Sequence, residues 1–329
     1  MSGFRRFTAA IAIVLVNLSL FPGATSGAAA PVRVAYSAIS GAMGPLWVAH
    51  DMGIFSRHGL EVQLLYIGGG SVVTQALLGG DVQFVRLGAN AVIQASLRGA
   101  ELKMIANTID RLVFKLMSKP EIQTPADLKG KTIGVTRLGG STDFALDLAL
   151  KKWGLRRGAD VNVLQAGGMP QLLSAIQSGP IVAGVISPPT NLQAQKLGLR
   201  ELVDFGDLEI PYPNSPLAAI QSHLAKNRDL VLRFLRGYAE GIHRVKTDRN
   251  NTMKIFSKYT AVKEPDILAE LYQIYGVKYL ERIPFVNSDG VEAVLQTEVK
   301  SGSAKAADFV DNSFVSELDR EGFFRQLYR

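Results

Sequence analysis

The residues best suited to bind a ligand lie at a glycine turn near the middle of the chain. Gly139 and Gly140 follow a short apolar run and precede Ser141, Thr142 and Asp143, after which apolar residues recur at helical spacing. We expect a helix to begin here, with the last three residues as candidate N-caps. The first turn of such a helix has unpartnered backbone N–H groups and the positive end of the helix dipole. The pattern predicts a site for an anion, although an ordinary strand–turn–helix connection would have the same sequence.

Similar loops recur where other short strands are expected to end. In an open parallel sheet, ligands bind beyond the carboxyl ends of the strands. These ends are rich in glycine, serine, threonine, asparagine or proline, and most of them open a helix. They therefore supply N–H and hydroxyl donors and permit close approach of the backbone. We expect six loops to face one cleft that binds a small ligand with an anionic group: 37–40, 68–71, 88–90, 137–142, 168–169 and 187–190.

Residue patterns for catalysis or metal binding are weak in this sequence. The four histidines are dispersed, and no two of them have the spacing of a metal site. The G-x-S-x-G, Walker and H-E-x-x-H motifs are absent, and the three glycines at 68–70 do not form G-x-G-x-x-G. Asp143 could act as a general base, but an acid in the first turn of a helix already interacts favourably with the dipole. We expect a binding protein rather than an enzyme, with no metal and no cofactor.

The first 28 residues have the pattern of a secretory signal peptide. Arg5 and Arg6 precede a short apolar run at 9–21, and a stretch of small residues, GATSGAAA, follows it. The run is shorter than the roughly 20 apolar residues of a membrane span. We expect cleavage after Ala28, where the small-x-small rule is met, and a soluble periplasmic protein.

Composition supports a globular protein of ordinary surface chemistry. The chain has 329 residues, of which 47% are hydrophobic and 20% charged, which is enough for two domains with sizeable cores. Loss of residues 1–28 removes two arginines and no acid, so the net charge falls from +7 to +5. Lysines and arginines are scattered, and we expect no nucleic-acid partner. Cysteine is absent, which excludes disulfides and a lipid anchor on an N-terminal cysteine.

Strand-like and helix-like segments alternate through most of the chain. The pattern predicts a parallel, doubly wound α/β sheet in each of two lobes, followed by a helical C-terminal part. Two segments of similar sequence, Gln75–Gly88 and Ser174–Ser187, each combine a helix end, a glycine and a strand, which suggests that the lobes resemble each other. Expected strands are 32–37, 60–68, 82–88, 102–107, 112–118, 132–135, 161–168 and 181–186. Expected helices are 41–55, one capped by Ser71, 89–97, a short one at 124–130, 141–153, 170–178, one after Pro188-Pro189, 226–246, 250–260, 265–275 and two more before the C-terminus.

Three phrases of the sequence resemble the periplasmic solute-binding proteins of nitrate/sulfonate/taurine-type ABC transporters (SsuA/THI5-like). They are PLWVAHDMGIFSRHGLEVQLLYIGGG, PADLKGKTIGVTRLGGSTDFALDLALKKWGL, and SPPTNLQAQKLG with the later IPYPNSPLA. The resemblance implies a type II periplasmic binding protein with two α/β lobes. The lobes would close on a small anionic solute, and the protein, a monomer, would dock on an ABC permease in the inner membrane. We expect one lobe at 29–112 and 218–329, and the other at 113–217.

By position, the resemblance places several residues at the ligand, and two more come from the same loops. The expected binding residues are Ser37, Gly70, Ser71, Gly88, Asn90, Arg137, Ser141, Thr142, Gly168 and Ser187.

The chain departs from the family pattern V-D-F-G-I-V-G-P-S at residues 82–90. Gln83 and Val182 stand where relatives commonly have an aspartate, which removes a typical polar contact. Arg86 replaces an apolar residue near the expected cleft. It either binds an anion or points away and pairs with an acid on the surface.

Two alternatives remain from the sequence. Fungal thiamine-pyrimidine synthases share the expected fold but resemble enzymes with a cysteine-bearing iron motif, and this chain has no cysteine. A secreted binding protein that serves a sensor instead of a permease would have the same sequence features. The ligand also stays open among sulfonate, nitrate, bicarbonate, a pyrimidine precursor and an aromatic carboxylate.

Overall fold

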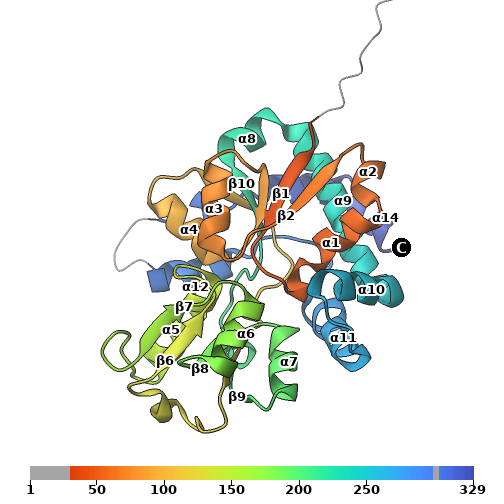
Figure 1. Cartoon of the computed structure of the whole chain (residues 1–329). Helices are drawn as coiled ribbons and strands as arrows, with labels where there is room; N and C mark the ends of the chain where they lie inside the picture. The colour runs from red at the N-terminus through yellow and green to blue at the C-terminus, as the bar shows by residue number, and fades with distance from the viewer. Residues whose placement is uncertain (1–29, 299–303) are drawn as a thin grey trace, which may run out of the picture. The chain divides into compact units, whose positions relative to one another are not determined.

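Two five-stranded sheets form the centre of the segment Pro31–Arg329 in the computed structural model (Figure 1). The structure describes residues 30–298 and 304–329. The predicted signal peptide at 1–28 lies outside the described residues.

The first sheet contains the four strands that precede the second sheet in the chain and one strand that follows it. Its order is β2-β1-β3-β10-β4, and β10 runs antiparallel to both of its neighbours. The strands are β1 (Val32–Tyr36), β2 (Val62–Tyr66), β3 (Phe84–Arg86), β4 (Leu102–Ala106) and β10 (Leu217–Ile220).

The second sheet repeats this order with the middle part of the chain. Its order is β7-β6-β8-β5-β9, and β5 is the antiparallel member. The strands are β5 (Lys115–Ser118), β6 (Thr132–Val135), β7 (Asn162–Gln165), β8 (Ile181–Ile186) and β9 (Arg200–Asp204). In each sheet the antiparallel strand is the one that follows a crossing of the chain from the other sheet. The mostly parallel α/β fold expected from the sequence is therefore confirmed.

The two similar sequence segments occupy equivalent places in the two sheets. The first contains α3 (Gly70–Leu78) and β3, and the second contains α6 (Met169–Ser178) and β8. β3 lies beside β1 as β8 lies beside β6, and the pairing registers correspond: Ala35 is opposite Val85, and Gly134 is opposite Gly184. The suggestion that the halves resemble each other is confirmed.

Helix boundaries differ from the expected ones where glycine ends or starts an element. The helix expected at 41–55 is divided into the 3₁₀ turn η1 (Gly41–Met43), α1 (Gly44–Asp51) and α2 (Ile54–Arg57). Gly53 has φ 64°, a left-handed conformation that glycine adopts without strain. The expectation that Ser71 caps a helix was wrong, because Gly69 is the N-cap of α3. In α5 (Ser141–Lys152), likewise, Gly140 is the N-cap, and Ser141 is already the first helical residue.

Two further predictions about elements were incomplete. Neither β9 nor β10 was expected from the sequence. The residues of β9, RELVD, are mostly polar and exposed or half-buried, without the alternation of a half-buried strand. The helix expected at 226–246 is α9 (Arg228–Thr247), and the short helix before it, α8 (Gln221–Lys226), was not expected. The helix expected at 265–275 is α11 (Pro265–Tyr272) followed by a π-helix, Gln273–Tyr279.

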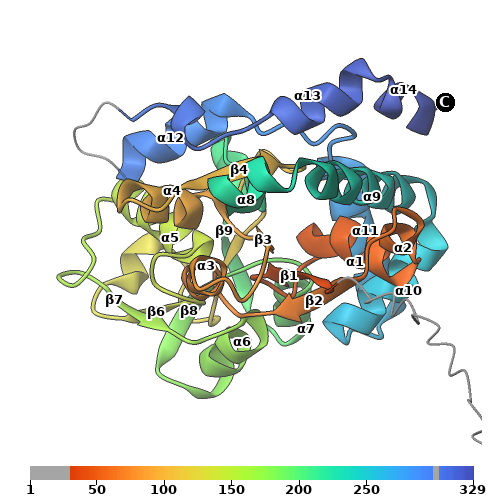
Figure 2. The ribbon, with the colours of Figure 1, turned by 90° about the horizontal axis from the view of Figure 1, so that it is seen from above.

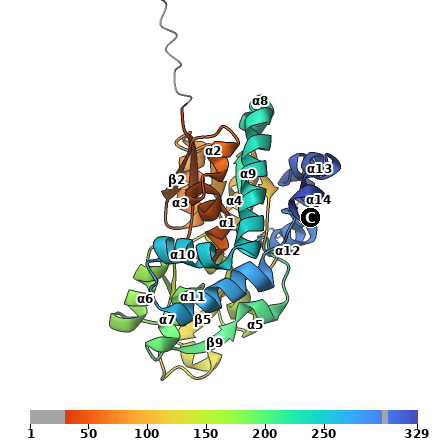
Figure 3. The same ribbon diagram turned by 90° about the vertical axis from the view of Figure 1, so that its right-hand side faces the viewer.

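The C-terminal helices return to the first sheet. α9 packs on α1, and α10 (Arg249–Thr260) lies beside α1 and α11 (Figure 3). α12 (Ser288–Glu298) lies beside α4 (Ala89–Leu97), and α13 (Ser313–Arg320) and α14 (Phe323–Leu327) pack against α9 (Figure 2). No helix within the described ranges has both the length and the apolar character that a membrane span requires.

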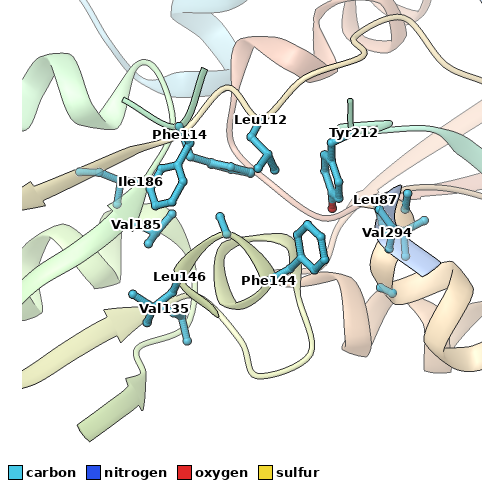
Figure 4. Packing of buried hydrophobic residues seen from close by; sticks show 14 of the residues in the cluster. Leu87, Leu112, Phe114, Val135, Phe144, Leu146, Val185, Ile186, Tyr212 and Val294 are labelled. Atoms are coloured by element: carbon cyan, nitrogen blue, oxygen red, sulfur yellow. The ribbon is translucent and has the colours of Figure 1, made fainter. Parts of the chain in front are cut away.

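One apolar cluster joins elements of both sheets. Figure 4 shows Leu87, which follows β3, and Val294 of α12 near Phe144 of α5. Leu112 and Phe114, from the crossing between β4 and β5, belong to the same cluster. Phe144 stacks on Tyr212 of the return crossing, with ring centroids 5.2 Å apart. This packing holds the loops at the carboxyl ends of both sheets close together.

Candidate functional site

A small, partly enclosed cavity lies where the loops of the two sheets meet. The cavity volume that the centre of a water molecule can occupy is about 20 Å³. On the same measure a single water needs roughly 10–15 Å³, so the cavity has room for one or two waters. The six loops expected to face one cleft all contribute to its wall. The lining residues are Ser37, Ala38, Ser40, Ala42, Met43, Gly69, Gly70, Gly88, Phe114, Thr136, Ser141, Thr142, Gly168, Met169, Ser187, Asn214 and Ser215.

Four helices of nine or more residues begin at this wall. The N-cap or first helical residue that lines the cavity is Gly70 for α3, Gly88 for α4, Ser141 for α5 and Gly168 for α6. The start of each helix offers backbone N–H groups and a partial positive charge. None of the lining side chains is charged, so this backbone potential is the main electrostatic feature of the wall itself. Such an arrangement favours a negatively charged ligand.

Acidic residues at the helix starts would oppose an anion, and only α5 has one. No acid lies in the first turn of α3, α4 or α6. Asp143, the acid of α5, accepts a hydrogen bond from the Gly139 N–H at 2.8 Å and forms an ion pair with Arg157. Its charge is thus neutralised away from the cavity wall, in line with a structural acid and not with a general base.

The hydroxyl groups of the wall divide into two kinds. Ser187 is 2% exposed, and its Oγ has no hydrogen-bond partner among the described residues. A buried hydroxyl without a partner is costly, so this group is available to a ligand. The Thr142 hydroxyl, in contrast, accepts from the Thr136 N–H at 3.0 Å and shares a 2.9 Å hydrogen bond with the Thr136 hydroxyl. Thr142 therefore fixes the turn between β6 and α5.

Seven of the ten residues expected from the sequence line the cavity, and three do not. The seven are Ser37, Gly70, Gly88, Ser141, Thr142, Gly168 and Ser187. The other three connect the loops of the two sheets. Ser71 Oγ donates to the Leu138 carbonyl at 3.3 Å, Asn90 Nδ2 donates to the Gly139 carbonyl at 2.9 Å, and Arg137 Nε donates to the Gly68 carbonyl at 3.4 Å. Each bond crosses from one sheet's loops to the other's, so these side chains hold the halves together.

Glycine permits the close approach of the halves at two positions. A Cβ atom at Gly88 would lie 2.5 Å from the Tyr212 hydroxyl and 2.8 Å from Cβ of Ser141. A Cβ at Gly168 would lie 2.5 Å from the hydroxyl of Tyr66, which belongs to the first sheet. Any larger residue at these positions requires a neighbour to move.

Several lining residues were missed from the sequence. Asn214 and Ser215 come from the crossing between β9 and β10. The Asn214 backbone N–H donates to the Ile109 carbonyl, and its side-chain Nδ2 donates to the Arg111 carbonyl. They lie in IPYPNSPLA, which is part of the family resemblance but does not contain the end of an expected strand. The rule that ligands bind beyond the carboxyl ends of parallel strands therefore did not select them. Phe114 comes from the other crossing for the same reason.

The surface ion pair considered for Arg86 was wrong, and the side chain does not reach the cavity. The side chain is 0% exposed, does not line the cavity, and forms no ion pair with a described carboxylate. Its Nη2 donates to the Ala42 carbonyl at 2.7 Å and to Thr108 Oγ1 at 3.0 Å. β3 ends at Arg86, and the side chain lies behind the cavity wall, not in the cleft or at the surface.

Metal ligands do not gather at this site. Among the described residues, no group of three or more histidine, cysteine, aspartate or glutamate side chains is arranged to hold a metal ion. The lining set of hydroxyl, amide, glycine and apolar groups suits a small polar ligand.

The fold is that of type II periplasmic binding proteins, and sequence comparison gives the family. The family model described as NMT1/THI5 like matches residues 41–250, and the chain belongs to this family. It is 27% identical over 257 residues to a Brucella abortus protein named as a binding protein, covering 77% of this chain and 79% of the relative.

Solved structures extend the likeness in fold. A protein from Bordetella bronchiseptica matches with a TM-score of 0.80 at 21% identity, covering 89% of this chain and 98% of the other. The nitrate-binding protein NrtA from Synechocystis gives 0.75 at 12% identity, covering 88% of both chains. The aliphatic sulphonate binding protein SsuA from Escherichia coli gives 0.65 at 20% identity, covering 81% and 90%.

The same fold also occurs in an enzyme. The desulfurization enzyme DSZB matches with a TM-score of 0.65 at 16% identity, covering 88% of this chain and 99% of that chain. The fold alone therefore does not separate binding from catalysis.

Proposed function

We propose that this protein is the solute-binding component of an ABC import system and that it binds a small anion in the cavity between its lobes. The observation that carries the proposal is the meeting of four helix starts at one wall, three of them without an acid in the first turn. The unpartnered Ser187 hydroxyl adds a donor there. The ligand class is a sulfonate, nitrate or carboxylate, which is consistent with the nitrate and sulphonate binders that share the fold.

The proposed lobes are 29–112 with 218–329, and 113–217. Cross-sheet hydrogen bonds from Ser71, Asn90 and Arg137 support a closed arrangement that opens to admit the ligand. Because the enclosed volume is small, a ligand with more than a few atoms requires the lobes to separate.

Export to the periplasm belongs to the same proposal. Cleavage after Ala28 would give a mature protein that begins at Ala29, and intact-mass analysis of a periplasmic fraction measures this directly. Recovery of the uncleaved chain in the membrane pellet would contradict it.

Catalysis is the second candidate, and the fold of DSZB is what favours considering it. The cavity wall contains no cysteine, histidine, lysine or acid, so it has no evident nucleophile activated by a base. A docking partner that is a sensor instead of a permease is compatible with the same site, and the neighbouring genes would separate the two.

Ligand screening tests the proposal. The melting temperature of the mature protein is measured with nitrate, formate, methanesulfonate, taurine and bicarbonate, and with the neutral molecules formamide and dimethyl sulfone as matched controls. We expect at least one anion to raise the melting temperature and to reduce the radius of gyration in small-angle scattering. Stabilisation only by neutral compounds would overturn the anion class, and turnover of a compound would favour the enzyme.

A further inference from the structure

Arg86 carries a positive charge that its surroundings do not neutralise. The side chain is fully buried, and its Nε and Nη1 groups have no hydrogen-bond partner among the described residues. The partners of Nη2 are the Ala42 carbonyl and the Thr108 hydroxyl, which are both uncharged. The guanidinium carbon lies 5.2 Å from the centre of the Tyr238 ring, which attracts a cation but does not cancel its charge.

The burial of the Arg86 guanidinium without a counter-charge lowers the stability of the folded protein. Burial of an ion without a counter-charge opposes folding, and two unfilled donors add to the cost. Burial lowers the pKa of Arg86 to about 9, so the guanidinium stays charged at neutral pH. The folded protein therefore keeps a charge for which the described part of the chain provides no partner.

The position of Arg86 connects this charge with the cavity. The carbonyl that it holds belongs to Ala42, and both Ala42 and Met43 line the cavity. On the chain itself, Gly88, two residues further on, lines the cavity as well. The guanidinium is thus separated from the site by a single layer of residues, on the side of the first sheet.

We propose that Arg86 is the specificity-determining positive charge of this cavity and makes it select a compact anion over a neutral molecule of the same shape. The inference rests on the proposed function. Arg86 acts across the layer formed by η1, without direct contact, because the low dielectric of the interior strengthens the attraction between separated charges. It also positions η1 through the Ala42 carbonyl. The helix starts and hydroxyls supply the hydrogen bonds, whereas Arg86 supplies the net charge.

The test separates charge from shape with matched ligands and matched variants. The mature protein and its Arg86→Lys and Arg86→Met variants are titrated with methanesulfonate and formate, and with their uncharged counterparts dimethyl sulfone and formamide, at constant ionic strength. Methionine fills a similar elongated space without charge. We expect Arg86→Met to weaken anion binding about 10- to 100-fold and to leave binding of the neutral compounds unchanged. Arg86→Lys retains a basic side chain, but burial lowers the pKa of a lysine below that of an arginine in the same place, so we expect its anion affinity to fall between those of wild type and Arg86→Met.

The outcomes distinguish this inference from the proposed function. Equal anion affinity in wild type and Arg86→Met overturns the role of Arg86, while the wild-type affinity still supports an anion-binding protein. Equal losses for anions and neutral compounds also overturn it, because they mark a deformed wall. If wild type binds neither of these two anions, the titrations are repeated with the anion identified by the screen. Failure of wild type to bind any of the screened anions overturns both proposals.

A measurement on the wild-type protein avoids dependence on the methionine variant. In nitrogen NMR of arginine side chains, the Arg86 Nε–H signal is assigned by its absence from Arg86→Lys. Saturation with methanesulfonate should shift this signal more than saturation with dimethyl sulfone. The absence of such a difference overturns the inference even if Arg86→Met does not fold.

Discussion

Arg86 and Val185 occupy matching positions in the two sheets, and they show how the halves differ. In β3, Val85 is opposite Ala35 of β1, and in β8, Gly184 is opposite Gly134 of β6. The next residue of each strand is Arg86 in one half and Val185 in the other, and both side chains are 0% exposed. The same backbone position thus buries a charge in the first half and an apolar group in the second.

The residues two positions further along the chain differ in the opposite sense, because the polar side chain is now in the second half. Gly88 follows Arg86 and has no side chain, whereas Ser187 follows Val185 and presents an unpartnered hydroxyl at the cavity. A repeated β–α–β element therefore supports two different contributions to one site. At these matching positions the first half has the buried charge of Arg86 and the close approach at Gly88, whereas the second half has the apolar Val185 and the hydroxyl of Ser187.

The largest expected effect comes from filling the space at Gly88. A Cβ there already lies 2.5 Å from the Tyr212 hydroxyl, so Gly88→Val should prevent the halves from closing. Overpacking of this kind costs about 3 kcal/mol, which corresponds to a loss of affinity of about 100-fold. Calorimetric titration with the anion identified by the screen measures this loss. Gly140→Ala is the control, since the nearest contact of its Cβ is 3.2 Å and should change affinity much less. An anion affinity of Gly88→Val within threefold of wild type would contradict the requirement that the halves approach each other closely at Gly88.

Removal of the Ser187 hydroxyl should have an intermediate effect on binding. Ser187→Ala removes a donor without breaking a bond in the ligand-free protein, because Oγ has no partner there. We expect about a 10-fold loss of anion affinity, from about 1.4 kcal/mol per hydrogen bond, and an unchanged or higher melting temperature. Ser178→Ala is the matched control, because its exposed hydroxyl bonds only to the Ser174 carbonyl within α6. An unchanged anion affinity in Ser187→Ala would contradict the proposed hydrogen bond between the Ser187 hydroxyl and the anion.

Thr142→Val should affect folding more than binding. The hydroxyl is engaged by the backbone and side chain of Thr136, so its loss leaves the buried Thr136 N–H without an acceptor. We expect the free energy of unfolding to fall by about 1 kcal/mol in urea denaturation, with anion affinity changed less than in Ser187→Ala. A large loss of affinity with unchanged stability would instead make Thr142 a direct ligand contact.

Much of the site followed from the sequence because it depends on strand ends. The rule that ligands bind beyond the carboxyl ends of parallel strands selected six loops, and all six line the cavity. Glycine and hydroxyl residues mark those ends in the local sequence. The equivalence of Gln75–Gly88 and Ser174–Ser187 was likewise visible, since both encode the same order of helix, turn and strand.

The remainder depends on distant contacts that no local pattern contains. Ser71, Asn90 and Arg137 are in the selected loops, but their side chains bond to carbonyls of the opposite half. Arg86 was expected either to bind an anion in the cleft or to pair with an acid at the surface, because arginines are rarely fully buried without a partner. Its actual environment is formed by Ala42, Thr108 and Tyr238, which lie far from it in the sequence.

A crystal structure of the mature protein with the bound anion tests the central claim most directly. We predict that the anion lies in the cavity between the two sheets, with its oxygens within hydrogen-bond distance of backbone N–H groups at the starts of α3, α5 or α6 and of Ser187 Oγ. A larger pocket of about 460 Å³, lined by Lys115, Asn191 and Tyr279 among others, offers a competing place. An anion bound in that pocket, with the cavity at the helix starts unchanged, would contradict the account.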